Sequence, residues 1–260
     1  MSPRIVTTRH GHVWEMRLNR ADKRNAADVA LLQELAAAYG ELERDPDLRV
    51  GVVTAEGDHF TGGLDLADVS GHLTAGGLSY VPEGAIDPWG VQTPPVSKPM
   101  VVAAKGICFT LGIELILAAD VAVAATETRF AQLEVARGIL PFGGATLRFT
   151  ERCGWGNAMR WVLTGDEFDA GEAHRMGLVQ EVVDHDSVDQ RARDIAQTIA
   201  AAAPLAVQAT LANARLARSA GHQAAGAQLQ PELMRLLQTR DATRGFQAFA
   251  TRTQAVFEGD

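Results

Sequence analysis

The sequence predicts a mixed α/β fold followed by a C-terminal helical appendage. Short runs of alternating or continuous apolar residues in the first half have the length and spacing of β-strands. Runs with helical spacing fall between them, which is the order expected of strand, helix, strand units. After Asp186 the strand pattern stops and helical spacing remains. We therefore predict a core over residues 1–185 and a helical region over residues 186–260.

Length and composition favour one large enzyme domain. At 260 residues the chain lies near the upper end of a single globular domain, so two equal domains are less favoured. A hydrophobic fraction of 47% and a charged fraction of 22% are typical of soluble enzymes. The formal net charge of −8 argues against binding to nucleic acid or to an anionic membrane, because both require a basic surface.

The cysteines and the apolar segments indicate a cytoplasmic protein without a metal. Cys108 and Cys153 lack the spacing of zinc ligands or of a disulfide framework, so we interpret both as buried thiols. The N-terminus lacks the charged and then apolar pattern of a signal peptide. The apolar stretch Ile113–Ala125 is interrupted by Glu114 and Asp120, which argues against a membrane span.

The first half contains several predicted strands and one long helix. The strands are expected at Arg4–Thr8, His12–Leu18, Arg49–Thr54, Pro99–Ala104 and Val121–Ala124. A helix is expected over Asp28–Arg44, because its leucines recur on one face. The segment Asn25–Asp28 offers side chains that cap its start. In the C-terminal region, Pro204 suits the first turn of a helix.

Two segments interrupt these patterns and are expected to be loops. They are Val69–Ser97, which is rich in glycine and proline and contains Tyr80 and Trp89, and Leu140–Gly144. A loop as long as the first is uncommon in a compact domain unless it has a function. We interpret it as a lid or binding segment; a disordered surface insertion is the alternative.

The segment Phe60–Leu66 contains a candidate anion cradle. It follows a predicted strand, and its paired glycines let backbone N–H groups approach a ligand oxygen. A plain tight turn is the more frequent explanation of such a pair. By itself the segment therefore leaves both interpretations open.

Two glutamates are candidates for acid–base chemistry. Glu114 falls near the start of a strongly apolar predicted helix, where loss of water would raise its pKa. A place at the polar edge of that helix is the alternative. Glu134 precedes a turn bounded by glycine and proline, and it could equally be a solvated loop carboxylate. Together with an oxyanion cradle, two carboxylates would suit the hydration of a conjugated thioester.

Several motifs in the same order resemble the crotonase superfamily, most closely the enoyl-CoA hydratases, from about Arg4 to Phe257. The matching segments are Leu18–Ala26, Phe60–Asp65, Gly106–Asp120, Phe130–Glu134, Gly138–Pro141 with Gly143 and Gly144, and Leu163–Asp166. The resemblance implies a crotonase-like spiral of ββα units with C-terminal helices. It also implies a homotrimer or a dimer of trimers.

The resemblance assigns roles to individual residues. It implies that Glu114 and Glu134 are catalytic and that the backbone N–H groups of Leu64 and Leu111 form the oxyanion hole. Glu134 would give a proton to the α carbon, and Glu114 would orient the water and help to deprotonate it. The residues implied in CoA or substrate binding are Arg24, Ala26, Gly63, Asp65, Leu66, Gly112 and Arg252.

Two positions depart from the family pattern. The family usually has glycine at the position of Leu111 and commonly alanine at that of Leu64. A backbone N–H donates from any residue except proline, so the oxyanion hole is retained in principle. The bulkier side chains would narrow the space around it.

The predicted activity is the reversible addition of water across the 2,3 double bond of an enoyl-CoA thioester. The alternative is double-bond isomerisation or another crotonase-type reaction of an acyl-CoA. Retention of both glutamates favours hydration over isomerisation, which needs one well-placed base. A non-catalytic acyl-CoA-binding protein is the alternative from another class. No metal or other cofactor is expected, because proton transfer and oxyanion stabilisation suffice for this reaction.

Overall fold

The computed structural model describes residues 2–260 and contains one large sheet and one small sheet. The large sheet has the order β1-β2-β3-β4-β6-β9, in which β1 and β2 are antiparallel and the other neighbours are parallel. The small sheet has the order β5-β7-β8. The strands are β1 (Ile5–His10), β2 (Val13–Leu18), β3 (Val50–Ala55), β4 (Met100–Ala104), β5 (Ile107–Phe109), β6 (Val121–Ala125), β7 (Arg129–Ala131), β8 (Phe168–Asp169) and β9 (Glu181–Val183).

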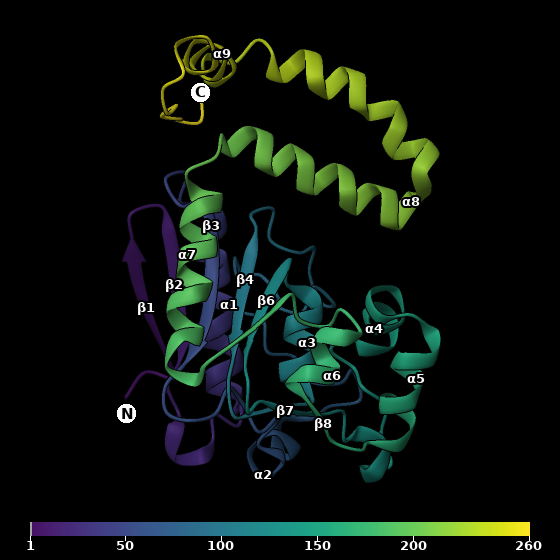
Figure 1. Ribbon diagram of the computed structural model, residues 1–260. Coiled ribbons are helices and arrows are strands. Elements are labelled where there is room, and N and C mark those ends of the chain that lie inside the picture. Colours follow the sequence, from purple (N-terminus) through teal and green to yellow (C-terminus); the bar gives the residue numbers. More distant parts are fainter. Residues whose placement is uncertain (1) are drawn as a thin grey trace.

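Helices cover both faces of the large sheet and form the C-terminal region (Figure 1). The α-helices are α1 (Val29–Arg44), α2 (Leu66–Val69), α3 (Leu111–Ala118), α4 (Ala145–Cys153), α5 (Trp155–Thr164), α6 (Ala170–Arg175), α7 (Val188–Ala200), α8 (Pro204–Leu236) and α9 (Arg240–Thr251). Short 3₁₀ turns are η1 (Ala21–Lys23), η2 (Ser70–His72), η3 (Glu134–Arg137) and η4 (His185–Ser187).

The predicted ββα spiral is confirmed by the order of the strands. The chain runs through β4 in the large sheet, β5 in the small sheet and then α3, and it repeats this path through β6, β7 and η3. The five predicted strands are present, with ends that shift by a residue or two. Strands β5, β7, β8 and β9 were not predicted, because two or three residues are too few to show an alternating pattern.

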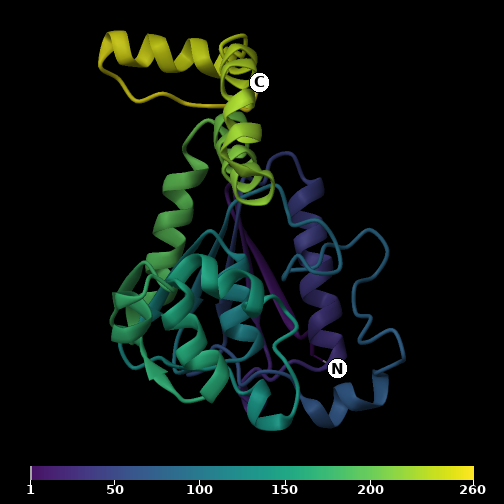
Figure 2. The same cartoon turned by 90° about the vertical axis from the view of Figure 1, so that its right-hand side faces the viewer.

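Helix α1 forms as its sequence predicts. The Asp28 side chain accepts a hydrogen bond from Leu31 N at 2.9 Å and caps the helix. The face that carries Leu31, Leu35 and Leu42 is buried in the main hydrophobic core. Figure 2 shows α1 and α7 on opposite faces of the sheet. A second, smaller apolar cluster lies between the sheet and α7.

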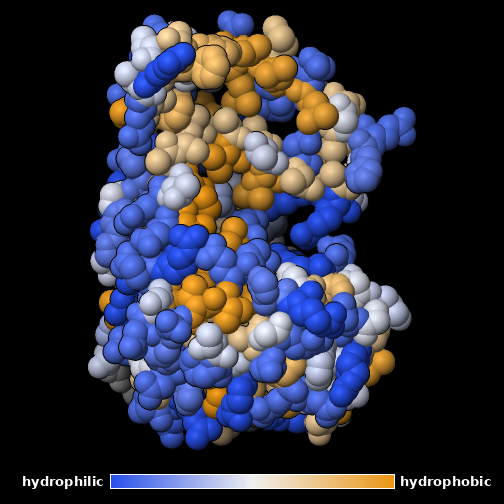
Figure 3. All heavy atoms as spheres, viewed as in Figure 1, coloured by the Kyte–Doolittle hydropathy of each residue, from blue (hydrophilic) through white to orange (hydrophobic). Residues whose placement is uncertain are grey.

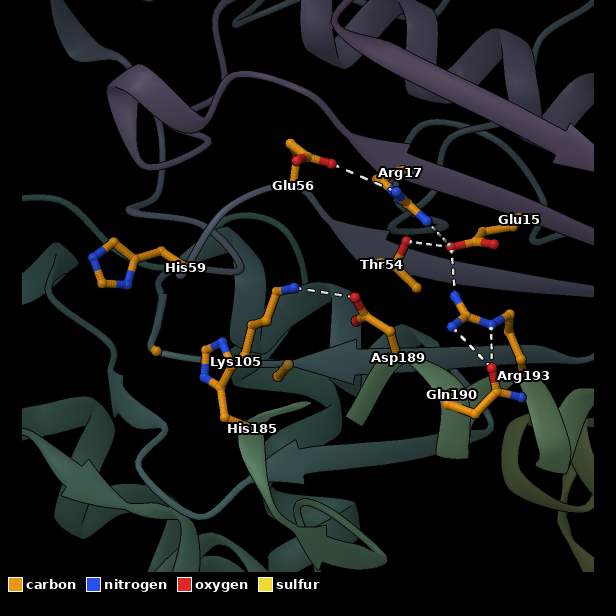
Figure 4. Close-up of polar contacts among 12 residues, drawn as sticks. Glu15, Arg17, Thr54, Glu56, His59, Lys105, His185, Asp189, Gln190 and Arg193 are labelled. Atoms are coloured by element: carbon orange, nitrogen blue, oxygen red, sulfur yellow. Dashed lines mark hydrogen bonds and ion pairs between the residues drawn. The ribbon is translucent and has the colours of Figure 1, made fainter. Parts of the chain in front are cut away.

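A polar cluster also joins α7 to the sheet (Figure 4). Glu15 of β2 is buried, and it accepts hydrogen bonds from Thr54 Oγ1 at 2.8 Å and from Arg193 of α7 at 3.2 Å. Burial opposes the ionisation of Glu15, but these bonds and that from Arg17 outweigh it and lower the pKa of Glu15. Lys105 forms a second link, through an ion pair with Asp189 at 3.0 Å. Helix α7 is therefore fixed by charge as well as by apolar packing.

Helices α8 and α9 form an arm that extends beyond α7 (Figures 1 and 2). Helix α8 bends at Gly221, whose φ of 87° is not helical, so the chain turns back on itself there. Along α8, all of which is described, only Ala225 is buried. Arg49, which directly precedes β3, links the C-terminal segment to the core. Its side chain donates hydrogen bonds to Phe257 O at 2.8 Å and to Ala200 O at 2.9 Å.

The apolar segments of the described chain do not form a single spanning helix. No individual helix among residues 2–260 is long and apolar enough to cross a membrane. The segments His185–Ala200 and Pro204–Leu236 meet that test only as a pair, bent by 105°. Cys108 and Cys153 are buried free thiols, as predicted, and burial raises the pKa of both.

Candidate active site

A cavity of about 610 Å³ brings the two predicted catalytic glutamates together with both predicted oxyanion residues. Glu114, Glu134, Leu64 and Leu111 all line it. Much of the remaining wall comes from the long segment between β3 and β4, which contributes Leu73, Leu78, Tyr80, Trp89, Val91 and Gln92. This segment is thus an ordered part of the pocket, and the interpretation as a disordered insertion is wrong.

Glu114 is a buried carboxyl group with a raised pKa. It lies in the first turn of α3 and is 3% exposed, so the alternative of a polar helix edge is wrong. Burial raises its pKa to about 7, and the charge of Glu134 acts in the same direction. The N–H of Ala145, which donates to Glu114 Oε1 at 3.1 Å, opposes that shift. A carboxyl group with a pKa near neutrality can exchange protons readily at physiological pH.

The raised pKa of Glu114 should make the protein less stable as the pH rises. Between its ordinary value near 4.5 and about 7, the folded chain holds a proton at Glu114 that the unfolded chain has lost. The free energy of unfolding should therefore fall by roughly 3 kcal/mol across this window through Glu114 alone. Urea unfolding at about pH 5 and about pH 8 should show a steeper fall for the wild type than for Glu114→Gln. Equal slopes for the two proteins would contradict the assignment.

Glu134 is the second buried carboxyl group of the pocket. It is the first residue of η3 and is 6% exposed. Gln132 Nε2 donates to Glu134 Oε1 at 3.2 Å, whereas Glu134 Oε2 is buried and has no partner among the described residues. Burial raises the pKa of Glu134. Glu134 lines the cavity, and a buried carboxyl oxygen without a partner has a lone pair available for a bound water or for a proton.

The backbone brings the two predicted oxyanion segments side by side. Thr61 N donates to Ile107 O at 3.0 Å, and Phe109 N donates to Thr61 O at 3.0 Å, so the two chains run parallel into the site. Beyond this pair lie Leu64 and Leu111. Among the described residues, neither the Leu64 N–H nor the Leu111 N–H has an acceptor. Two unpaired donors at one cavity are the arrangement that stabilises an oxyanion.

The turn before α3 has an unusual backbone. Thr110 precedes the helix at φ 49° and ψ −112°, a conformation that costs a residue other than glycine about 1–3 kcal/mol. Its side chain fills space beside Gly63, where an added methyl group would overlap Thr110 Oγ1. Gly112 is also held closely, since a methyl group there would lie 2.6 Å from Thr61 Cγ2. These contacts keep the two segments in register.

Leu64 and Leu111 both contact the main hydrophobic core. Leu111 is a member of the main hydrophobic cluster, and Leu64 packs against that cluster while remaining partly exposed. Both residues still line the cavity, so their side chains shape its wall beside the two amides. The two N–H groups without an acceptor among the described residues thus lie beside leucine side chains at the cavity.

The loop predicted to bind CoA packs directly against the first oxyanion segment. Arg24 O accepts from Gly62 N at 2.8 Å, and the Arg24 side chain is exposed to solvent. Ala27 N donates to Gly63 O at 2.8 Å, next to the partly buried Ala26. A CoA nucleotide bound on this loop would therefore lie beside the mouth of the cavity. The roles of Arg24 and Ala26 stay predictions.

The other residues predicted to bind CoA have different surroundings. Asp65 forms an ion pair with Arg20 at 2.8 Å, and that hydrogen bond lowers the pKa of Asp65. Leu66 opens α2 and is exposed. Arg252 directly follows α9 and is also exposed. In Figure 1, α9 lies at the opposite end of the molecule from α2. Within one chain the structure does not bring Arg252 to the cavity.

Three features that support the wall of the cavity were not predicted from the sequence. Asp87 is 1% exposed and organises the loop around it, and Gly143 approaches Glu114 closely. Arg148 of α4 donates to Gly90 O and to Gly143 O, both at 3.4 Å, and so links the loop to the turn before α4. The aromatic residues Tyr80 and Trp89 in a long loop rich in glycine and proline were the available signal.

The comparisons with known proteins agree with this geometry. A family model described as enoyl-CoA hydratase/isomerase matches residues 8–260. The carnitinyl-CoA dehydratase of Citrobacter koseri is 31% identical over 268 aligned residues, with 100% of both proteins covered. The crystal structure of a probable enoyl-CoA hydratase/isomerase from Mycobacterium abscessus is 54% identical, covers 99% of each chain and has a TM-score of 0.96. That of an enoyl-CoA hydratase from Mycobacterium tuberculosis H37Rv is 31% identical, covers 100% of each chain and has a TM-score of 0.89.

These matches run through the core, the cavity and the C-terminal arm. The predicted resemblance and the predicted fold are both confirmed by them. The chain therefore belongs to the enoyl-CoA hydratase/isomerase family.

Proposed function

We propose that the protein adds water reversibly across the 2,3 double bond of an enoyl-CoA thioester. The observation that carries this proposal is the presence of two buried carboxyl groups, Glu114 and Glu134, on the wall of one cavity. Beside them lie two backbone N–H groups that have no acceptor among residues 2–260. An enzyme that only moves a double bond needs one such base. Two carboxyl groups can hold a water molecule between them.

The proposed chemistry follows from the positions of these groups. The thioester oxygen accepts hydrogen bonds from Leu64 N and Leu111 N, which stabilise the negative charge that develops on it. Glu114 orients the water and helps to remove its proton, while the water oxygen bonds to C3. Glu134 gives its proton to the α carbon. The one proton that the water loses to Glu114 then passes to Glu134, while the other proton of the water stays in the new 3-hydroxyl group. The net change is the addition of one water molecule.

The test is an assay with a short 2-enoyl-CoA. Hydration removes the conjugated double bond, so the ultraviolet absorbance of the thioester should fall and the product should gain the mass of one water. A protein that shifts the double bond of a 3-enoyl-CoA but ignores the 2-enoyl compound would be an isomerase. Tight binding of both compounds without turnover would identify a non-catalytic acyl-CoA-binding protein.

The proposed reaction needs no metal or redox group, since proton transfer and oxyanion stabilisation account for each step. We therefore expect the rate of hydration to be unchanged after dialysis against a metal chelator.

The cytoplasm is the proposed location of the protein. Cell fractionation with an antibody against the protein would check this proposal.

A homotrimer, or a dimer of two trimers, is the proposed assembly. The arm presents apolar side chains to solvent, among them Leu229, Leu233, Met234, Phe246 and Phe249. Hydrophobic residues gather on the arm at the top of Figure 3. A patch of this kind usually marks a protein interface.

Light scattering should give the mass of three or six chains for the wild type. Phe249, which is 88% exposed, offers a direct test of the interface. The substitution Phe249→Asp should reduce the mass, because a buried unpaired charge opposes association. A wild type that runs as a monomer would disprove this assembly.

A further inference from the structure

The long loop beside the active site is organised around one buried carboxylate, Asp87. Asp87 Oδ1 accepts from Tyr80 Oη at 2.6 Å and from Trp89 N at 3.0 Å. Asp87 Oδ2 accepts from Val91 N and from Gln92 N, both at 2.7 Å. No lysine or arginine of the described chain lies within salt-bridge distance of Asp87. Hydrogen bonds from the loop itself therefore offset the loss of water around this charge.

These bonds hold an indole ring over the catalytic machinery. Trp89 is 3% exposed and packs edge-on against Tyr80, with ring centroids 5.8 Å apart. Trp89 Nε1 donates to Leu111 O at 3.0 Å, so the ring is tethered to the residue whose N–H is the proposed oxyanion donor. Tyr80 and Trp89 both line the cavity.

The same ring lies next to Glu114. A methyl group built on Gly143 would lie 2.5 Å from Glu114 Oε2 and 3.1 Å from Trp89 Cδ1, so the carboxyl group and the ring meet at this glycine. The ring is therefore in a position to shield Glu114, and the water molecule proposed to bind there, from bulk solvent. The loop contains no helix or strand between η2 and β4. Its position beside the cavity therefore depends on individual hydrogen bonds such as those to Asp87.

We propose that Asp87 is a positioning residue that acts through Trp89, fixing the indole ring against Leu111 and Glu114 so that this wall of the cavity stays closed to bulk solvent. Asp87 itself does not line the cavity, whereas Trp89 does. The catalytic consequence rests on the proposed hydration. The consequence for binding, a closed apolar wall for the acyl group, does not depend on it.

The substitution Trp89→Phe tests the tether, because it removes the hydrogen bond to Leu111 O and keeps an aromatic ring. We expect kcat for hydration to fall roughly tenfold, the worth of one well-placed hydrogen bond. The affinity for free CoA should stay unchanged, and the preference for butyryl-CoA over free CoA should fall.

Trp14→Phe is the matched control. Trp14 Nε1 also donates to a backbone carbonyl, Ala38 O at 3.1 Å, but it does so between β2 and α1, away from the cavity. The two variants thus lose the same kind of bond. Trp14→Phe should leave both kcat and the preference for butyryl-CoA as in the wild type.

Asp87→Ala tests whether the hydrogen bonds to Asp87 hold the loop and the Trp89 ring in place. It leaves four donors without their acceptor, so the loss of kcat should exceed that of Trp89→Phe and reach on the order of 10²-fold. The proposal is overturned if Trp89→Phe matches the wild type in both readouts, or if Trp14→Phe loses as much as Trp89→Phe. A different result would separate the two proposals. If the wild type hydrates no substrate, and Trp89→Phe but not Trp14→Phe loses the preference for butyryl-CoA, the proposed hydration is wrong and the positioning role of Asp87 is retained.

Discussion

Replacing Glu134 by glutamine is expected to reduce hydration of a 2-enoyl-CoA by about 10²–10⁴-fold. The amide keeps the shape of the side chain but cannot give a proton to the α carbon. Glu134 makes one side-chain hydrogen bond within the described chain, to Gln132, so the fold should tolerate the change. Affinity for a saturated acyl-CoA, measured by calorimetry, should remain close to that of the wild type.

A glutamate on the surface provides the control for this experiment. Glu167 forms an exposed ion pair with Arg129 at 3.2 Å, and such pairs contribute little to stability. Glu167→Gln should therefore leave both turnover and affinity unchanged. If Glu134→Gln retained wild-type turnover, Glu134 would not be the proton donor, and the proposed division of roles with Glu114 would be wrong.

The second large effect is expected at Gly143. The substitution Gly143→Ala would place a methyl group 2.5 Å from Glu114 Oε2, so the carboxyl group must move. Gly143 has no positive φ, and the backbone itself therefore accepts alanine. A displacement of about 1 Å in a catalytic group can reduce the rate on the order of 10²-fold. Steady-state kinetics should show this loss mainly in kcat.

Gly156→Ala is the matched change. Gly156 lies in α5 with no atom within 4 Å of an added methyl group. Alanine there should raise the free energy of unfolding by about 0.5–1 kcal/mol and leave kcat unchanged. A normal kcat for Gly143→Ala would show that Glu114 does not depend on this close approach.

The sequence was most informative where local pattern and chemistry coincide. Glu114 within an apolar helix indicated either a buried carboxyl group or one at the polar edge of that helix, and the structure shows the buried one. For Glu134 the residues alone left a solvated loop open, because its burial depends on segments distant in the chain. The order of the motifs predicted the family and the ββα spiral, and the comparisons confirm both.

The wall of the cavity could not be predicted in the same way. Asp87 binds mainly backbone N–H groups of its own loop, and such bonds leave no periodic pattern in a sequence. The contact of Trp89 with Leu111 joins residues that are far apart along the chain. Gly143 matters because of what lies beside it, which only the folded chain reveals.

The packing of Thr110 against Gly63 restricts the order in which mutations can accumulate at the oxyanion hole. Any side chain at position 63 would collide with the Thr110 hydroxyl, and the positive φ of Gly63 disfavours a side chain even without that collision. A lineage could replace Thr110 by glycine first, because glycine adopts the same backbone with less strain. In the reverse order the intermediate protein would suffer both the collision with Thr110 and the backbone strain at position 63, so replacing Thr110 first is the less costly order.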